Sequence, residues 1–548
     1  MAATYTRNNA WNNGGTLAGN PDLLWYAIGV GEMMKRDITD TKSWWYFGAI
    51  HGDNVQAWDS ITAPPQVPSP PPDLKGWNQC QHGTWYFPPW HRGYLIALEN
   101  QVRADIVARG GPSTWALPYW DYFGTNPANQ FNIPPAFMEQ NFPSAANLPA
   151  NVPPDIPGSA NPLYVAARYG PNGDGVIFVP TEAGIAANPQ DPQSDFASGV
   201  ATLQCMSDTT YTGDTEFGGP QTGFNHPGQD FGDLENNPHN LVHVYVGNFQ
   251  GNDQNNGEQG LMCDPDMAGL DPIFYLHHGE IDRLWAIWNV TMGNSNPTQL
   301  NWLQGPTTNG QSDFEMPKDG AWWLFTPGDV GDFSKLNYTY QDMSAPAGLV
   351  TAAQAFSSRL ATLRAAPAAP VAAGAGGGPT VPPEVELMGA TQAAVAVKGS
   401  GARAAVRLDT GVRRKVAASL AAASVNAPPD RVFLRLDNIV GTTGAALSVY
   451  INLPEGGKPG QYPKLHAGSI GLFGLRQASA KDGKHGGKGL NFTLDITKVI
   501  DELHLRQSFD LDTLNVSLVP NSSIPESKPI TVGRISIYRQ SGTGESPR

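Results

Sequence analysis

A stretch of almost pure alanine, proline and glycine divides this chain of 548 residues into two parts. Residues 364–383 have the sequence RAAPAAPVAAGAGGGPTVPP. A segment without large apolar side chains cannot bury a core, so it predicts an interdomain linker. The sequence therefore predicts one folding unit over residues 1–363 and a second one over residues 384–548.

The two units differ in their hydrophobic periodicity. The first unit has helical periodicity in short pieces, such as Leu23–Met34 and Trp90–Glu99, and we expect it to be mainly helical and rich in loops. In the second unit, apolar and polar residues alternate in runs separated by turn residues, which predicts strands and a β-sandwich. The predicted strands are Arg431–Leu436, Leu447–Leu453, Leu490–Ile496, Leu514–Val519 and Ile530–Tyr538.

Charge and cysteine content exclude several classes of protein. Lys and Arg total 34 against 49 Asp and Glu, and a net charge of −15 disfavours binding to nucleic acid. Three cysteines are too few for a disulfide framework, which indicates a reducing compartment. No signal peptide and no run of eighteen apolar residues is evident, so we expect a cytoplasmic protein without a membrane partner. Export assisted by a partner protein is left open.

The clearest chemical signal is a set of histidines on or near predicted helices. His82 and His91 lie in CQHGTWYFPPWHRGYLIALEN. Pro88 and Pro89 predict an extended approach to a helix that starts at Trp90, with His91 in its first turn.

A second set follows further along the chain. His239 and His243 are four residues apart, a spacing that stacks two imidazoles on one helix face and lets both reach one metal ion. His277 and His278 lie in another helical segment, and Asp282 follows His278 by four residues. A carboxylate in that position can orient a metal ligand or a neighbouring cation.

Together these histidines predict metal coordination by imidazole alone, although any one of them taken singly would more often be structural. Zinc, copper, iron and nickel all accept such ligands. A single zinc site needs only three or four ligands, so two sets of histidines indicate a binuclear centre. Copper is the natural candidate for dioxygen chemistry, but the spacing leaves the metal open.

Two segments resemble the copper signatures of the family that contains tyrosinases, catechol oxidases and mollusc-type haemocyanins. The first comprises His82, Phe87, Trp90, His91, Arg92, Leu95 and Glu99, and the second comprises Asp271, Pro272, Phe274, Tyr275, His278 and Asp282. The resemblance extends from about residue 20 to Tyr340, where NYTY is similar to the element that closes the family's core. It implies a four-helix bundle holding two copper ions.

The resemblance also implies the ligands. One copper ion would be held by His51, His82 and His91, and the other by His239, His243 and His278. The Pro-rich insertion lengthens the gap between His51 and His82, and His277 is the alternative to His278. Cys80 precedes His82 by two residues, as in family members with a thioether between sulfur and imidazole. The alternative for Cys80 is a free buried thiol.

Two further features concern substrate. Glu235 and Asn240 resemble the pair that in some family members holds a water able to accept a phenol proton. The alternative for Glu235 is a carboxylate that stabilises a helix N-terminus, and the alternative for Asn240 is a solvated helix residue.

Residues 431–454 resemble the β-sandwich that covers the active site and keeps plant polyphenol oxidases and some bacterial tyrosinases latent. Phe473, between glycines in SIGLFGLR, is the expected plug of the pocket, with Tyr450 as rival and a sandwich-core role as the alternative.

The resemblance thus implies a latent copper tyrosinase or polyphenol oxidase that hydroxylates monophenols and oxidises o-diphenols to o-quinones. The alternatives are an oxidase restricted to catechols or o-aminophenols, and a haemocyanin-like oxygen carrier. Phenols and dioxygen are the expected partners. A homo-oligomer and a copper-delivery protein are compatible with the sequence but not indicated by it.

Overall fold

The computed structural model describes most of the chain. The described residues are 5–61, 65–72, 74–121, 133–169, 204–213, 215–223, 230–247, 260–308, 311–346, 349, 352–364, 384–424, 428–482, 486–506, 512–521 and 523–542. The predicted linker lies outside them, apart from its first residue. No helix in these ranges has the length and apolar character needed to cross a membrane.

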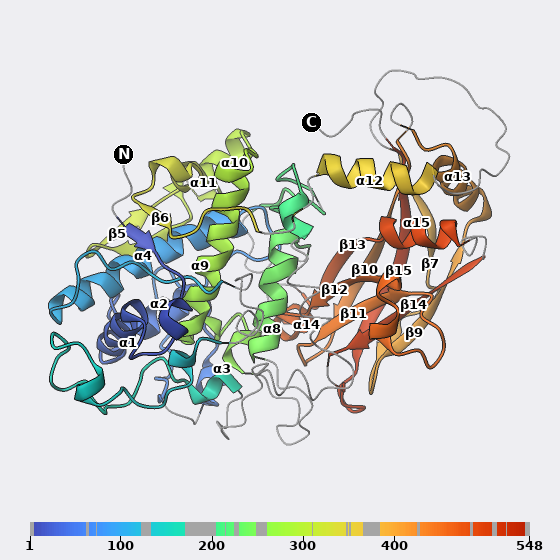
Figure 1. Cartoon of the computed structure of the whole chain (residues 1–548). Coiled ribbons are helices and arrows are strands. Elements are labelled where there is room, and N and C mark those ends of the chain that lie inside the picture. Colours follow the sequence, from blue (N-terminus) through green and yellow to red (C-terminus); the bar gives the residue numbers. More distant parts are fainter. Residues whose placement is uncertain are drawn as a thin grey trace.

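The first part of the chain forms a helical core, on the left in Figure 1. Its α-helices are α1 (Pro21–Met34), α2 (Trp44–His51), α3 (Val55–Asp59), α4 (Phe87–Ala108), α8 (Leu241–Gly247), α9 (Pro272–Ala286), α10 (Leu300–Gln304) and α11 (Pro327–Gly331). A π-helical turn, η6 (Glu235–Asn240), leads into α8, and a second, η10 (Ile287–Thr291), extends α9. The short strands are β1 (Tyr5–Arg7), which pairs in parallel with β6 (Tyr338–Tyr340), and two small hairpins made of β2 (Thr307–Thr308), β3 (Gln311–Ser312), β4 (Glu315–Lys318) and β5 (Ala321–Leu324).

Local sequence explains where the central helices begin. Ser43 caps α2 by accepting a hydrogen bond from the Tyr46 amide, and Asp271 caps α9, with a proline in the first position of that helix. Helix α4 starts at Phe87, so the predicted extended approach through Pro88 and Pro89 is wrong. The first turn of a helix does not use its amide hydrogens, and therefore tolerates both prolines.

A buried ionic cluster around Asp282 closes the core. Its carboxylate accepts hydrogen bonds from Arg92 at 2.5 Å, Arg7 at 3.1 Å, Tyr338 at 2.6 Å and Tyr340 at 2.5 Å. Burial alone would raise the pKa of Asp282, but the two guanidinium groups and the two phenols lower it overall. Asp282 therefore ties α9 to α4 and to the β1–β6 pair.

The second part forms a β-domain, on the right in Figure 1. Its strands are β7 (Val385–Ala390), β8 (Val395–Val397), β9 (Ala402–Leu408), β10 (Arg431–Val440), β11 (Ala446–Ile451), β12 (His466–Gly471), β13 (Leu490–Asp495), β14 (Thr513–Pro520) and β15 (Ile530–Gln540). They join in one sheet of order β12-β11-β14-β9-β7-β15-β10-β13, with β8 also on β15. Its helices are α13 (Thr410–Ala421), α14 (Leu475–Ser479) and α15 (Thr497–Leu505).

The predicted fold class, a helical core followed by a C-terminal β-domain, is confirmed. In place of two separate sheets, the strands form a single sheet that curls on itself. Its two end strands in the strand order, β12 and β13, lie next to each other. Helix α12 (Ala352–Arg364) belongs with this domain by its packing. Leu360 and Leu363 enter the β-domain core, and Arg359 binds the Asp501 carboxylate at 2.6 Å.

Contacts between the two domains are both apolar and ionic. Phe231 of the helical part stacks on Phe492 of β13 with ring centroids 5.1 Å apart, and Arg435 of β10 binds Asp230 at 3.0 Å. Phe473, which follows β12, packs in the hydrophobic core of the helical domain. The β-domain therefore inserts a side chain into the part of the molecule that holds the histidines.

Candidate metal centre

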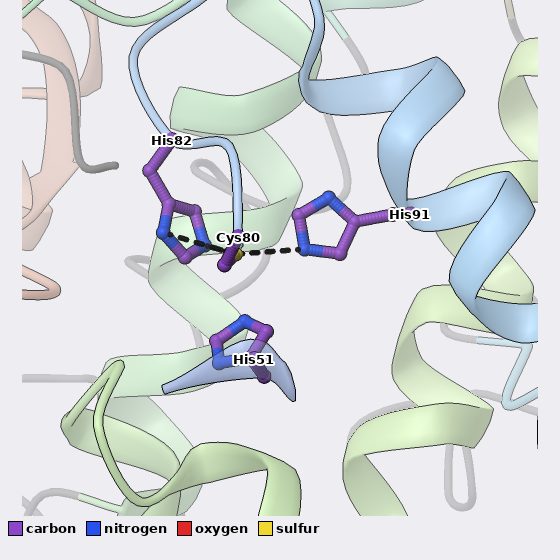
Figure 2. Close-up of side chains that lie close together, drawn as sticks. All are labelled: His51, Cys80, His82 and His91. Carbon is purple, nitrogen blue, oxygen red and sulfur yellow. Dashed lines mark hydrogen bonds between the residues drawn. The ribbon is translucent and has the colours of Figure 1, made fainter. Parts of the chain in front are cut away.

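Buried histidines from the helices α2, α4, α8 and α9, from the π-helical turn η6 and from the loop before α4 converge in two adjacent groups. The first group is His51, Cys80, His82 and His91, and the second is His239, His243, His277 and His278. Within each group the potential ligand atoms all lie within 4.8 Å of one another. The rings of His91 and His278 stack with centroids 4.2 Å apart, so the groups face each other. Figure 2 shows the first group, with the Cys80 sulfur between His82 and His91.

One loop orients a histidine in each group. The loop covers residues 261–267, between α8 and α9. The Nδ1–H of His51, the last residue of α2, donates to the Pro265 carbonyl at 2.7 Å. The Nδ1–H of His243 in α8 donates to the Met262 carbonyl at 2.6 Å. Because a carbonyl can only accept, each bond places the ring proton on Nδ1 and leaves the Nε2 lone pair for a metal.

Two further histidines are oriented from within their own helices. The Nδ1–H of His91 donates to the Phe87 carbonyl at 2.9 Å, one turn earlier in α4. His239 lies with Nδ1 3.0 Å from the Asn240 side-chain oxygen, which fits a bond donated by Nδ1–H. The sequence signals found these histidines but not the carbonyls at Phe87, Met262 and Pro265, since every residue has a backbone carbonyl.

Several imidazole nitrogens in the centre have no protein partner. Among the described residues, none forms a hydrogen bond with Nε2 of His51, His239 or His243, or with either ring nitrogen of His278. Burial lowers the pKa of His51 and His243 to about 3 and lowers that of His239 and His278 as well. Neutral, buried imidazoles whose nitrogen lone pairs accept no hydrogen bond are suited to bind metal ions.

Cys80 lies between two of the imidazoles of the first group. Its sulfur is 3.4 and 3.5 Å from the two ring nitrogens of His82 and 3.4 Å from Nε2 of His91. Burial, with a smaller contribution from the Glu235 charge, raises the pKa of the thiol well above its ordinary value. The sulfur is therefore protonated in the absence of metal, and it lies within reach of the His82 ring.

Glu235 and Asn240 lie at opposite ends of η6, and both are buried. Both carboxylate oxygens of Glu235 accept the Gly83 amide hydrogen, at 2.8 and 3.0 Å, next to His82. Burial raises the pKa of Glu235 well above its ordinary value. The Asn240 amide nitrogen has no hydrogen-bond partner within the described ranges. The two polar groups thus flank the histidine groups from a single turn.

Phe473 covers the centre from the β-domain. Its ring stacks on His243 with centroids 4.0 Å apart and meets the rings of His82 and His239 edge-on at 5.2 and 5.7 Å. Only 2% of the residue is exposed. Tyr450, the rival plug, instead packs in the β-domain core beside His466.

The comparisons with known proteins agree with this arrangement. The common central domain of tyrosinase matches residues 41–291, and a domain of unknown function (DUF7868) matches residues 384–540. The chain is 32% identical to tyrosinase HcTyr1 of Hahella sp. (strain CCB-MM4), covering 94% of this chain and 97% of that protein. It is 29% identical to polyphenol oxidase A1 of Vicia faba, over 50% of this chain and 39% of that protein.

Solved structures share the complete fold. Latent apple tyrosinase superimposes with a TM-score of 0.51 at 19% identity, covering 98% of this chain and 97% of that one. Latent aurone synthase from a natural source gives a TM-score of 0.52 at 18% identity, covering 100% and 91%. Together with the buried imidazoles, these similarities show that the two groups fit a binuclear copper centre.

The structure brings all six predicted ligands together, but His277 lies in the same group as His278. We expect His278→Ala to bind about one copper ion per chain, because His278 has two nitrogens without a protein partner and its ring stacks on His91. His277→Ala is the matched control and should bind two. Copper content measured by atomic absorption after dialysis distinguishes them. The reverse pattern would assign His277 as the ligand.

Proposed function

Because this chain belongs to the tyrosinase family of copper oxidases, we propose that it ortho-hydroxylates monophenols and oxidises o-diphenols to o-quinones, and that its β-domain keeps it latent. Phenols and dioxygen are the substrates of this family. The observation that carries the monophenol activity is the buried pair Glu235 and Asn240 next to the copper ligands. When bound, the two copper ions supply the two-electron chemistry with dioxygen.

The protein's own contribution is to remove the phenol proton. A phenol has a pKa near 10 and binds a metal poorly at neutral pH until it is deprotonated. In the proposed arrangement, the Asn240 amide nitrogen donates to a water molecule and the Glu235 carboxylate accepts from it. This water takes the phenol proton as general base and passes one of its own protons to the Glu235 carboxylate, whose raised pKa suits it to hold the proton. An o-diphenol is easier to oxidise and depends less on this step.

Replacing Asn240 with Ala should reduce monophenol turnover about 100-fold, the lower end of the usual contribution of general acid–base catalysis, and reduce catechol turnover much less. Oxygen uptake measured separately with a monophenol and a catechol tests this. Asn236→Ala, four residues earlier and also buried, is the matched control.

Copper content has to be measured in the same variants, because Asn240 also orients His239. Equal losses on both substrates with two copper ions bound would remove the proton-transfer role. Oxidation of catechol alone by the unaltered protein would make it a catechol oxidase, and reversible dioxygen binding without turnover would favour a carrier.

The proposed cause of latency is Phe473. Its ring lies against His243, His82 and His239, so a substrate ring that approaches these histidines from the same side has to displace it. Burying a Phe side chain is worth about 1.5–3 kcal/mol. We therefore expect Phe473→Ala in the full chain to lower the apparent KM for catechol about tenfold or more. Steady-state oxygen uptake measures this, and an unchanged KM would show that the ring does not block the site.

A thioether between Cys80 and His82 is the last part of the proposal. The sulfur lies 3.4 and 3.5 Å from the two ring nitrogens, and Cε1 is the carbon bonded to both. Forming the S–C bond removes the thiol hydrogen and the Cε1 hydrogen, and their two electrons and two protons reduce dioxygen to hydrogen peroxide. Peptide mass spectrometry of protein exposed to copper and air should show this peptide lighter by two hydrogen atoms. An unchanged mass with an alkylatable thiol would leave Cys80 as a free cysteine.

A further inference from the structure

The loop of residues 261–267 connects the copper centre to the β-domain. On its inner side, the carbonyls of Met262 and Pro265 fix the rings of His243 and His51, one in each histidine group. On its outer side, it faces α14 of the β-domain: a Cβ added to Gly474, the residue before α14, would lie 3.1 Å from the Pro265 ring. A shift of this loop would therefore move ligands of both copper ions.

Side chains of α14 donate hydrogen bonds to the carboxylates of the loop of residues 261–267. Asp264 is buried, with 1% of the residue exposed, and its two oxygens accept hydrogen bonds from Arg476 and Gln477. The Gln477 amide also reaches the Asp266 carboxylate at 3.2 Å. Because a buried carboxylate without a cation is strongly unfavourable, the loop retains this conformation best while Arg476 is in place.

We propose that Asp264, Arg476 and Gln477 are positioning residues through which the docked β-domain retains copper. Docking fixes the loop of residues 261–267, the loop fixes His51 and His243, and both copper ions are held more firmly. The β-domain then affects the copper centre in two separate ways. Phe473 covers the histidines, and α14 fixes the loop of residues 261–267 that orients His51 and His243. This inference rests on the copper centre and does not depend on which phenols the enzyme oxidises.

The test is the rate at which the copper-loaded full-length protein releases copper to an excess of a chromogenic Cu(I) chelator under anaerobic reducing conditions. Loss of groups that orient metal ligands typically weakens metal affinity 10- to 100-fold. We expect Arg476→Ala combined with Gln477→Ala to release both copper ions about tenfold faster than the unaltered protein. Arg476→Lys, which keeps a cation next to Asp264, should restore most of the slow release.

The matched control is Arg435→Ala. It also breaks an ion pair between the two domains, with Asp230 at 3.0 Å, but it leaves the loop and α14 untouched. This variant should release copper at the original rate. Circular dichroism of the copper-free variants confirms that each is folded, and Arg476 is 42% exposed, so its loss leaves no cavity in the core.

Two outcomes would overturn the proposal. Release from the double variant at the original rate would show that α14 is only an interdomain contact. Equal acceleration by Arg435→Ala would show that loosening the domain interface anywhere frees copper, without a special role for the loop. If the protein oxidises catechols but not monophenols, the expected rates of copper release stay the same. Failure of the proposed monophenol activity is therefore distinguishable from failure of this inference.

Discussion

The helical domain buries histidines from both groups as neutral imidazoles, and this burial limits how its helices can pack. A histidine in an apolar interior loses its charge, and each of its nitrogens needs a hydrogen bond or a metal. Here the Nδ1 protons of His51, His91 and His243 go to backbone carbonyls. This leaves the opposite Nε2 atoms for copper, which these residues would hold when it is bound. The elements that supply the carbonyls are therefore as important as the histidines.

That requirement explains the dense packing around the centre. The helices α2, α4, α8 and α9 carry the histidines and have to keep their relative positions. The imidazole nitrogens between these helices do not bind one another, so other contacts must hold the helices in place. The Asp282 cluster ties α9 to α4, with two guanidinium groups and two phenols around one carboxylate. The loop of residues 261–267 binds a histidine of α2 and a histidine of α8. Its own position depends on the β-domain.

The two domains are consequently parts of one functional unit. Phe473 belongs by sequence to the β-domain and by packing to the core of the helical domain. Leu360 and Leu363 show the reverse, since they precede the linker and enter the β-domain core. A domain boundary drawn from composition marks where the chain lacks large side chains, but it does not mark where packing changes. Strand prediction had a similar limit, because β9 and β12 are rich in alanine and glycine, and β7 and β8 show little alternation of apolar and polar residues.

The chemistry of the donors and the order of the two domains can be read from the sequence, because histidine spacing and strand periodicity are local properties of the chain. What those donors can do depends on contacts between distant parts of the chain. The carbonyls of Met262 and Pro265 carry no sequence signal, and the approach of Phe473 to His243 joins residues 230 positions apart in the chain. Contacts of this kind depend on how whole domains pack, which local residue patterns do not encode.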